Sequence, residues 1–150
     1  LKKLLGGAAY FVTAIKKLGD LTAVPAAFAA PDFEWSGDFG VLGIGTGRQA
    51  GGGNVLCPHA TIDDGLLDVC LLPHLTGSTL QEALGDLIAN GAAAIENWVV
   101  SARVPWVEVQ AQRETQINLD GEPVRASSFR FEIVPSALRA HVPADCPLVS

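Results

Sequence analysis

Methionine is missing from this chain of 150 residues, which opens on Leu1, Lys2 and Lys3. Because a natural protein starts with an initiator methionine, we expect the chain to be a piece of a longer polypeptide. The remaining part of that polypeptide is then expected to hold half of the active site. At its own length, the chain is expected to fold around a single core.

Cysteine is scarce, with only Cys57, Cys70 and Cys146 in the chain. The three residues are far apart, odd in number and without a Cys-x-x-Cys pair, which argues against a zinc ribbon and against a disulfide framework. The three histidines lack metal-ligand spacing as well. This usage favours a reducing, cytoplasmic location.

Long hydrophobic runs and basic patches are also missing. The longest apolar stretch near the start, from Leu4 to Ile15, is bounded by lysine pairs and is shorter than the roughly 20 residues that a membrane span needs. The net charge is -6 and no basic stripe is interleaved with aromatic residues, so we expect no nucleic-acid partner. The same sign of charge disfavours adsorption of the whole surface to anionic membranes.

The standard nucleotide-binding and hydrolase motifs are absent. Residues 45–50, Gly-Thr-Gly-Arg-Gln-Ala, match the dinucleotide fingerprint, but glycines follow where the fingerprint needs a helix, so we reject a Rossmann site. Neither a Walker A loop nor the Gly-x-Ser-x-Gly of a serine hydrolase occurs. The segment is then a glycine-rich edge where Arg48 admits a phosphate or a second polypeptide, or else a bulged turn with a solvated arginine.

What the chain does contain is a pattern of strands. Short apolar or alternating runs between residues 21 and 72, and again between 98 and 142, are separated by glycine and proline and predict roughly eight to ten strands. The run from Leu66 to Leu72 predicts a strand covered on both faces. We therefore predict a mostly β fold, an antiparallel β-sandwich, in preference to βαβ winding.

Two helices are predicted beside the strands. Apolar residues at helical spacing predict an amphipathic helix over residues 1–19, at the junction with an upstream segment. A second helix is inserted among the strands, with a capping box formed by Ser78 and Gln81, an apolar stripe, and Gly91 at its end. We expect this second helix to pack on the sheet.

Two acidic turns are the most informative feature of the chain. Residues 63–65, Asp-Asp-Gly, and 120–122, Asp-Gly-Glu, lie at the ends of apolar strands, where glycine lets the backbone turn sharply. The first turn offers a carboxylate and nearby carbonyl oxygens, the mixed oxygen shell that magnesium or calcium accepts. The second offers Glu122 as a proton acceptor for an attacking hydroxyl. Both are also common turn sequences, so a turn without chemistry stays the alternative at each.

Several segments together carry a resemblance to a known family. In chain order they are residues 45–53, 57–60, 63–68, 118–123, 135–139 and 142–148. Singly these motifs are common, but in this order and spacing they are specific. Over nearly its whole length the chain resembles the C-terminal half of the YegS-like bacterial lipid kinases, which are relatives of the diacylglycerol kinase catalytic family.

The resemblance implies a domain organisation. In such kinases, similar in build to NAD kinases and sphingosine kinases, an N-terminal α/β domain with a Gly-Gly-Asp-Gly-Thr signature binds ATP, and a C-terminal β-sandwich completes the cleft. That signature does not occur here. Residues 1–19 would then be a junction helix and residues 20–150 the second domain, which by itself would be inactive. The upstream ATP-binding domain would be its partner.

The resemblance also implies roles for individual residues. Glu122 matches the catalytic proton acceptor. Asp64, with the main-chain oxygens of Thr61 and Leu66, matches the magnesium position, with calcium as the alternative ion. The family often has an apolar residue where Thr61 stands, a change that a backbone ligand tolerates. A further set of residues would line the cleft or the substrate site: Arg48, Gln49, Gly51, Gly52, Gly53 and Asp120.

The implied reaction is transfer of the ATP γ-phosphoryl group to a lipid alcohol, with diacylglycerol and phosphatidylglycerol as candidates. A sphingoid base or a soluble nucleotide is the alternative acceptor. A protein of another class, a non-catalytic β-sandwich used for lipid binding or assembly, is the third interpretation. A lipid substrate implies peripheral contact with the inner membrane face from the cytoplasm, and a homodimer is left open.

Overall fold

The computed structural model describes residues 22–50 and 54–149 of the chain. The helix predicted for residues 1–19 and the glycines Gly51, Gly52 and Gly53 lie outside the described residues, so the predictions made for them stay predictions. The described elements are, in chain order, β1 (Val24–Ala30), β2 (Phe33–Gly45), β3 (Gln49–Ala50), β4 (Asn54–Val55), β5 (Leu67–Pro73), α2 (Gly77–Asn90), the 3-10 helix η1 (Ala92–Trp98), β6 (Val100–Val104), β7 (Trp106–Leu119) and β8 (Glu122–Glu132).

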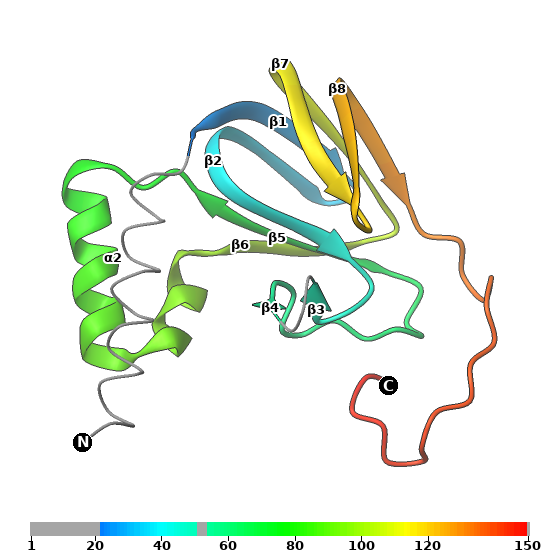
Figure 1. Cartoon of the computed structure of the whole chain (residues 1–150). Coiled ribbons are helices and arrows are strands. Elements are labelled where there is room, and N and C mark those ends of the chain that lie inside the picture. Colours follow the sequence, from blue (N-terminus) through cyan, green and yellow to red (C-terminus); the bar gives the residue numbers. More distant parts are fainter. Residues whose placement is uncertain (1–21, 51–53, 150) are drawn as a thin grey trace.

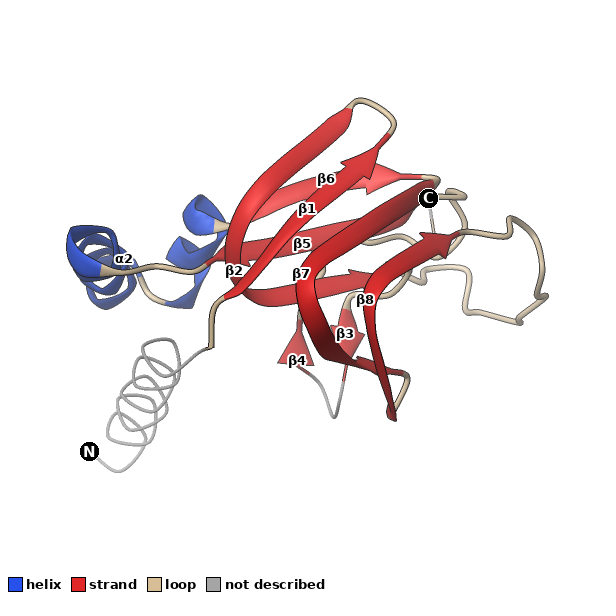
Figure 2. Cartoon of the chain, turned by 90° about the horizontal axis from the view of Figure 1, so that it is seen from above, coloured by secondary structure: helices blue, strands red, loops and turns tan. Residues whose placement is uncertain are grey.

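Six strands form one antiparallel sheet in the order β6-β5-β2-β1-β7-β8, and β3 pairs with β4 in a separate ribbon. β2 joins two parts of the sheet, because its first half pairs with β1 and its second half with β5. The register shifts between Phe39 and Val41, and Figures 1 and 2 show β2 curving strongly along its length. The predicted mostly β, antiparallel, sandwich-like fold is therefore confirmed.

The hairpin of β7 and β8 is also irregular. Its register shifts so that residues 111–114 of β7 stand opposite the single residue Ser127 of β8. Beyond this shift, residues 115–119 and 122–126 continue the hairpin as a distal arm, which lies in front of β1 and β2 in Figure 1. Side chains of this arm and of the hairpin base line one small apolar cavity. The arm therefore covers part of the apolar interior.

The hydrophobic core gathers side chains from β1, β2, β5, β6 and β7. β5 is buried on both faces from Leu67 to Leu72, with only Cys70 half-buried, as the continuous apolar run predicts. The first half of β7 instead alternates buried and exposed residues, which is typical of a strand with one face in water. The largest fully buried side chains are Leu71, Val69, Val104 and Val107.

The ends of α2 agree with the sequence at one terminus only. The N-cap is Thr76, without a side-chain capping bond, so the predicted capping box of Ser78 and Gln81 is wrong, and both residues lie inside the helix. At the other end, Gly91 has a φ of 76° and its N–H donates to the carbonyl of Leu87 over 3.0 Å. The predicted end of the helix is therefore confirmed.

α2 stands at one end of the sheet and packs mainly against η1, rather than over a face of the sheet as we expected (Figures 1 and 2). Asp86 of α2 accepts hydrogen bonds from Asn97, over 3.3 Å, and from the indole N–H of Trp98, over 3.2 Å. These bonds attach η1 to the helix. Within residues 22–50 and 54–149, no helix is long and apolar enough to cross a bilayer.

Candidate functional site

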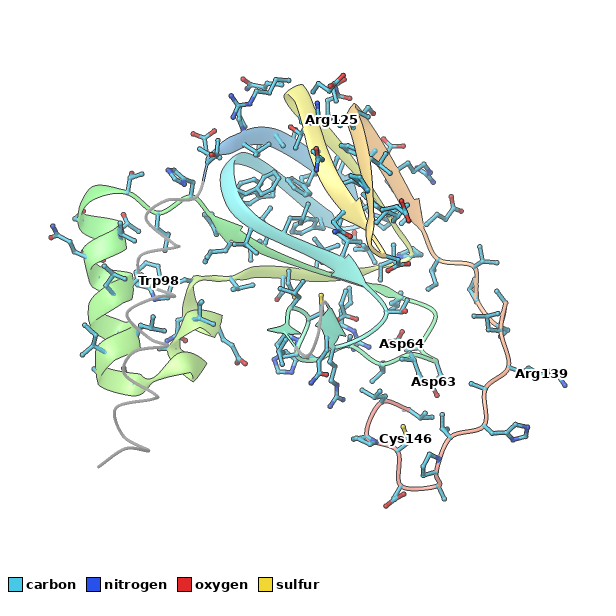
Figure 3. All side chains as sticks on the ribbon, viewed as in Figure 1. Asp63, Asp64, Trp98, Arg125, Arg139 and Cys146 are labelled. Carbon is cyan, nitrogen blue, oxygen red and sulfur yellow. The ribbon has the colours of Figure 1, made fainter. Side chains whose placement is uncertain are left out.

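The first acidic turn forms the loop that precedes β5. The Asp64 carboxylate accepts a hydrogen bond from the hydroxyl of Thr61, over 2.6 Å, and another from the N–H of Leu66, over 2.9 Å. The guanidinium of Arg103, on β6, contacts the same carboxylate. Figure 3 shows Asp63 and Asp64 on this loop below the sheet. Three donors thus hold one carboxylate in place.

These contacts make the contribution of Asp64 to stability depend on pH. The Thr61 hydroxyl first, and then the Leu66 N–H and Arg103, hold the pKa of Asp64 below its ordinary value, against the opposing effect of burial. A carboxyl with a depressed folded pKa contributes stability above its unfolded pKa, and that contribution is lost as the pH falls through the folded value.

We therefore expect the difference in unfolding free energy between wild type and Asp64→Asn to be full at neutral pH and to shrink below about pH 4. Urea unfolding of both proteins across this range measures the difference. The asparagine variant is its own control for the other carboxyl groups, because they titrate in both proteins. A difference that stays constant down to about pH 2 would contradict this linkage.

Asp68 follows this loop in the sequence, as the second residue of β5. Its side chain is buried, with the residue only 4% exposed, and it stands directly opposite Arg103 in the pairing of β5 with β6. Its Oδ1 lies 3.9 Å from Nε of Arg103, and its buried Oδ2 has no hydrogen-bond partner among the described residues. Burial raises the pKa of Asp68, and the charge of Arg103 counteracts this.

The loop offers the oxygen atoms that a hard divalent cation prefers. No group of three His, Cys, Asp or Glu residues able to hold a metal occurs in the part of the chain that the structure describes, so a cation here needs main-chain oxygens. Among the described residues, no backbone hydrogen bond of a turn or loop ends on the carbonyl oxygen of Thr61 or Leu66. Together with the Asp64 carboxylate they form a donor set that fits magnesium or calcium.

Gly65 makes the sharp turn between Asp64 and Leu66. Its φ of 72° lies in the left-handed region, while a Cβ would meet only Pro135, at 3.7 Å, so strain and not crowding opposes a side chain. We expect Gly65→Ala to destabilise the fold by about 1–2 kcal/mol.

The matched control for this change is Gly85→Ala. Gly85 lies within α2 and a Cβ there would meet nothing within 4 Å, so we expect this variant to stabilise the fold by about 1 kcal/mol. Urea unfolding of both variants measures the two shifts. Equal shifts of the same sign would show that the turn at Gly65 does not need a left-handed residue.

The second acidic turn closes the hairpin of β7 and β8. Leu119 pairs with Glu122, which leaves Asp120 and Gly121 as a two-residue loop with φ values of 49° and 104°. The side chain of Asn118 accepts the N–H of Gly121 over 2.7 Å and fixes the turn. The predicted hairpin turn is confirmed, and its positive φ values are those of the favoured tight turns.

Glu122 is exposed at the start of β8. In the described part of the chain its side chain has no hydrogen bond or ion pair, so it is not bonded to the loop of Thr61, Asp64 and Leu66 or to Arg103, whose bonds are to one another. The cross-strand neighbour Leu119 is 50% exposed. The tip thus presents an acidic group beside apolar surface.

Arg48 ties together three parts of the chain. Its Nε donates to the carbonyl of Ala60 over 2.9 Å, and its Nη2 donates to the carbonyl of Pro147 over 2.7 Å. Next to it, Gln49 is exposed and pairs with Val55 in the ribbon of β3 and β4. Arg48 therefore has a structural role at the loop before Thr61, whatever further part it has in a cleft.

The structure brings Thr61, Asp64 and Leu66 together and joins Arg103 and Asp68 to them. We assigned no role to the last two from the sequence. A charged residue inside the apolar run of β5 was a signal for Asp68. Nothing in the sequence near Arg103 points to the Asp64 loop, because their contact depends on how β6 pairs with β5.

Comparison with known proteins decides the family. Residues 1–142 match the family model of the YegS C-terminal NAD kinase beta sandwich-like domain. The chain belongs to this family. The resemblance found in the sequence is thereby confirmed, and the sandwich-like arrangement described above is the one that the family's description states.

Relatives of this YegS C-terminal domain agree with the match. Proteins of Stenotrophomonas maltophilia (strain K279a), 53% identical over 150 residues, and Pseudomonas aeruginosa (strain UCBPP-PA14), 51% identical over 149 residues, are both named "Probable lipid kinase YegS-like". Each comparison covers 99% of this chain and 48% of the relative, so the chain spans about half the length of the curated relatives it matches. A solved diacylglycerol kinase structure from Bacillus anthracis str. Sterne shares the fold, with a TM-score of 0.53 and 16% identity over 83% of this chain and 47% of that one.

Proposed function

We propose that this domain is the C-terminal half of an ATP-dependent lipid kinase, which transfers the γ-phosphoryl group to a lipid hydroxyl. The names of relatives about 50% identical support the class of reaction, and their greater length supports a further, upstream domain, to which we assign the binding of ATP. The observation that carries the proposal on this chain is Glu122, an exposed carboxylate without a described partner, held by a tight turn beside apolar surface.

In the proposed mechanism, Glu122 accepts the proton of the lipid hydroxyl as the hydroxyl oxygen bonds to the γ-phosphorus. The bond between that phosphorus and the β–γ bridging oxygen breaks, and ADP leaves with the electron pair. Phosphoryl transfer requires mainly positioning and neutralisation of charge from a protein. On this side of the cleft we assign positioning to the remaining residues that the resemblance places there: Arg48, Gln49, Gly51, Gly52, Gly53 and Asp120.

Magnesium is the proposed ion of the Asp64 loop, and calcium is the alternative. The Asp64 carboxylate and the main-chain oxygens of Thr61 and Leu66 would hold it. When bound, the ion supplies positive charge that neutralises the loop or the phosphates. The hydrogen bonds from Thr61 and Leu66 to Asp64 keep the carboxylate oriented for this role.

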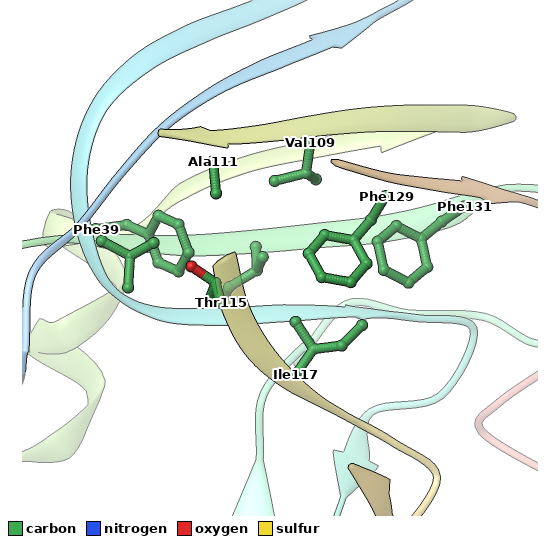
Figure 4. A pocket seen from close by; sticks show the side chains of 9 residues that line it. Phe39, Val109, Ala111, Thr115, Ile117, Phe129 and Phe131 are labelled. Atoms are coloured by element: carbon green, nitrogen blue, oxygen red, sulfur yellow. The ribbon is translucent and has the colours of Figure 1, made fainter. Parts of the chain in front are cut away.

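The acyl chains need an apolar surface, and the cavity under the distal arm is too small to provide it. Figure 4 shows this cavity, whose volume is about 20 Å³, enough for about one water molecule. Its lining is apolar except for Thr115: Val24, Phe39, Leu42, Val109, Ala111, Thr115, Ile117, Phe129 and Phe131. We therefore assign the acyl chains to the surface between this domain and its upstream partner, at the inner membrane face, and not to the interior of the sandwich.

A substrate panel tests the proposal. Full-length protein is incubated with labelled ATP, Mg²⁺ and vesicles that contain diacylglycerol, phosphatidylglycerol or sphingosine, or with a soluble nucleotide. Label transfer to a lipid supports the kinase, and transfer to the nucleotide alone replaces its substrate class. Vesicle binding without transfer to any acceptor supports a lipid-binding module instead. This chain by itself should show no appreciable ATP binding in calorimetry, and tight binding would contradict the proposed division of domains.

A further inference from the structure

Arg103 lies between two carboxylates, that of Asp64 in the proposed cation loop and that of Asp68 on β5, the strand that follows the loop. Its Nη2 contacts Oδ2 of Asp64, and its Nε lies 3.9 Å from Oδ1 of Asp68. The Thr61 hydroxyl lies 3.2 Å from the same Nη2. The Arg103 side chain is 47% exposed, so its guanidinium can move while the residue stays on β6. One cation is therefore shared by two anions.

Of the two carboxylates, Asp68 is the one that can accept further hydrogen bonds. Its side chain is 5% exposed and its Oδ2 is buried without a hydrogen-bond partner among the described residues. A buried carboxylate needs a counter-charge, since removing an ion from water costs several kcal/mol. The β5-β6 pairing places Arg103 directly opposite, so this counter-charge is built into the sheet. Nε of Arg103 and Oδ1 of Asp68, 3.9 Å apart, form an ion pair, and Oδ2 of Asp68 can still accept a hydrogen bond.

We propose that Arg103 and a divalent cation compete for the Asp64 carboxylate, and that Asp68 receives the guanidinium when the cation is bound. The inference rests on the cation loop of the proposed function and concerns residues outside its ligand set. A cation on Asp64 would repel the neighbouring guanidinium, because like charges about 4 Å apart repel even in water. The fork of Nε and one Nη fits both oxygens of a carboxylate, so Asp68 can accept two hydrogen bonds.

The consequence is that Arg103 sets the affinity of the loop. Without a divalent cation it keeps Asp64 paired and the loop folded, and on binding it moves to a second acceptor instead of into water. Arg103 and Asp68 are thus positioning residues for the cation site. The two residues should act on cation affinity in opposite directions.

Calorimetric titration of full-length protein with Mg²⁺ alone tests this. We expect Arg103→Gln to bind Mg²⁺ about fivefold more tightly than wild type, and Asp68→Asn about fivefold more weakly, which is the size of the interaction between two unit charges about 4 Å apart in bulk water. In the Arg103→Gln background, adding Asp68→Asn should change affinity less than about twofold, because Asp68 acts through Arg103. Arg130→Gln is the matched control, since Arg130 pairs with Glu108 and Glu132 instead.

A crystal structure of the wild-type protein with Mg²⁺ gives a readout that needs no variant to fold. We expect both the Nε and one Nη of Arg103 within hydrogen-bond distance of Asp68 and neither on Asp64. An arginine still on Asp64 with the ion bound there, or equal effects of Asp68→Asn in both backgrounds, overturns the competition and leaves the cation site standing. Absence of any Mg²⁺ or Ca²⁺ binding to wild type overturns the cation site itself, and the competition with it.

Discussion

Replacing Glu122 with glutamine should lower the rate of phosphoryl transfer to lipid by about 10²–10⁴-fold, the usual contribution of a general base. Glutamine keeps the size and the hydrogen-bonding oxygen of the side chain but cannot take up the proton. Because Glu122 is exposed and its side chain has no partner in the described residues, the fold should not change. Steady-state kinetics with labelled ATP measure the loss, which should fall on kcat and leave the KM for ATP nearly unchanged.

The control for this experiment is Glu114→Gln on the same hairpin. Glu114 is an exposed glutamate among residues 111–114, at the register shift, at the other end of the arm from the turn. It should keep full activity, so a loss confined to Glu122→Gln would be a property of the tip. Unchanged turnover in Glu122→Gln would remove this residue from the mechanism.

The second large effect concerns stability and centres on Leu71. This side chain is fully buried in β5, in the cluster that joins both parts of the bent sheet. Leu71→Ala should destabilise the fold by about 2–5 kcal/mol, because it removes buried apolar atoms and leaves a cavity that packed neighbours fill only in part. Urea denaturation followed by tryptophan fluorescence measures this change.

Leu138→Ala makes the same chemical change on the surface. Leu138 is 91% exposed, so its loss should alter the free energy of unfolding by no more than about 0.5 kcal/mol. A similar cost at both positions would mean that β5 is not the centre of the core.

Parts of the fold that depend on neighbouring residues could be predicted from the sequence. The apolar run around Val69 predicted a strand covered on both faces, and the Asp-Gly pair at 120–121 predicted a hairpin turn. Gly91 predicted the end of a helix because few other residues adopt its backbone conformation. The predicted start of this helix was wrong. Ser78 and Gln81 have the spacing of a capping box, but the helix begins at Gly77 and includes both residues in its first turns.

In the candidate site, too, the contacts between residues near one another in the sequence could be predicted, and those between distant residues could not. Thr61, Asp64 and Leu66 lie within six residues of one another, so one tight turn brings them together. The acidic turn indicated a carboxylate with nearby carbonyl oxygens, and the family resemblance named Thr61 and Leu66. Arg103 follows Asp64 by 39 residues and reaches it only through the pairing of β6 with β5. The effect of Arg103 on the charge of the loop could therefore not be predicted.

By itself the sequence determined the kind of most segments and the family of the whole, because backbone preferences, turn chemistry and motif order are properties of neighbouring residues. It did not predict the 3-10 helix η1, and the strand expected near residues 140–142 is wrong, because no strand follows β8 in the described residues. Only the tertiary structure decided which charges meet. Strand register sets Arg103 opposite the buried Asp68 and beside Asp64, and a shift of one residue would turn its side chain to the other face of the sheet.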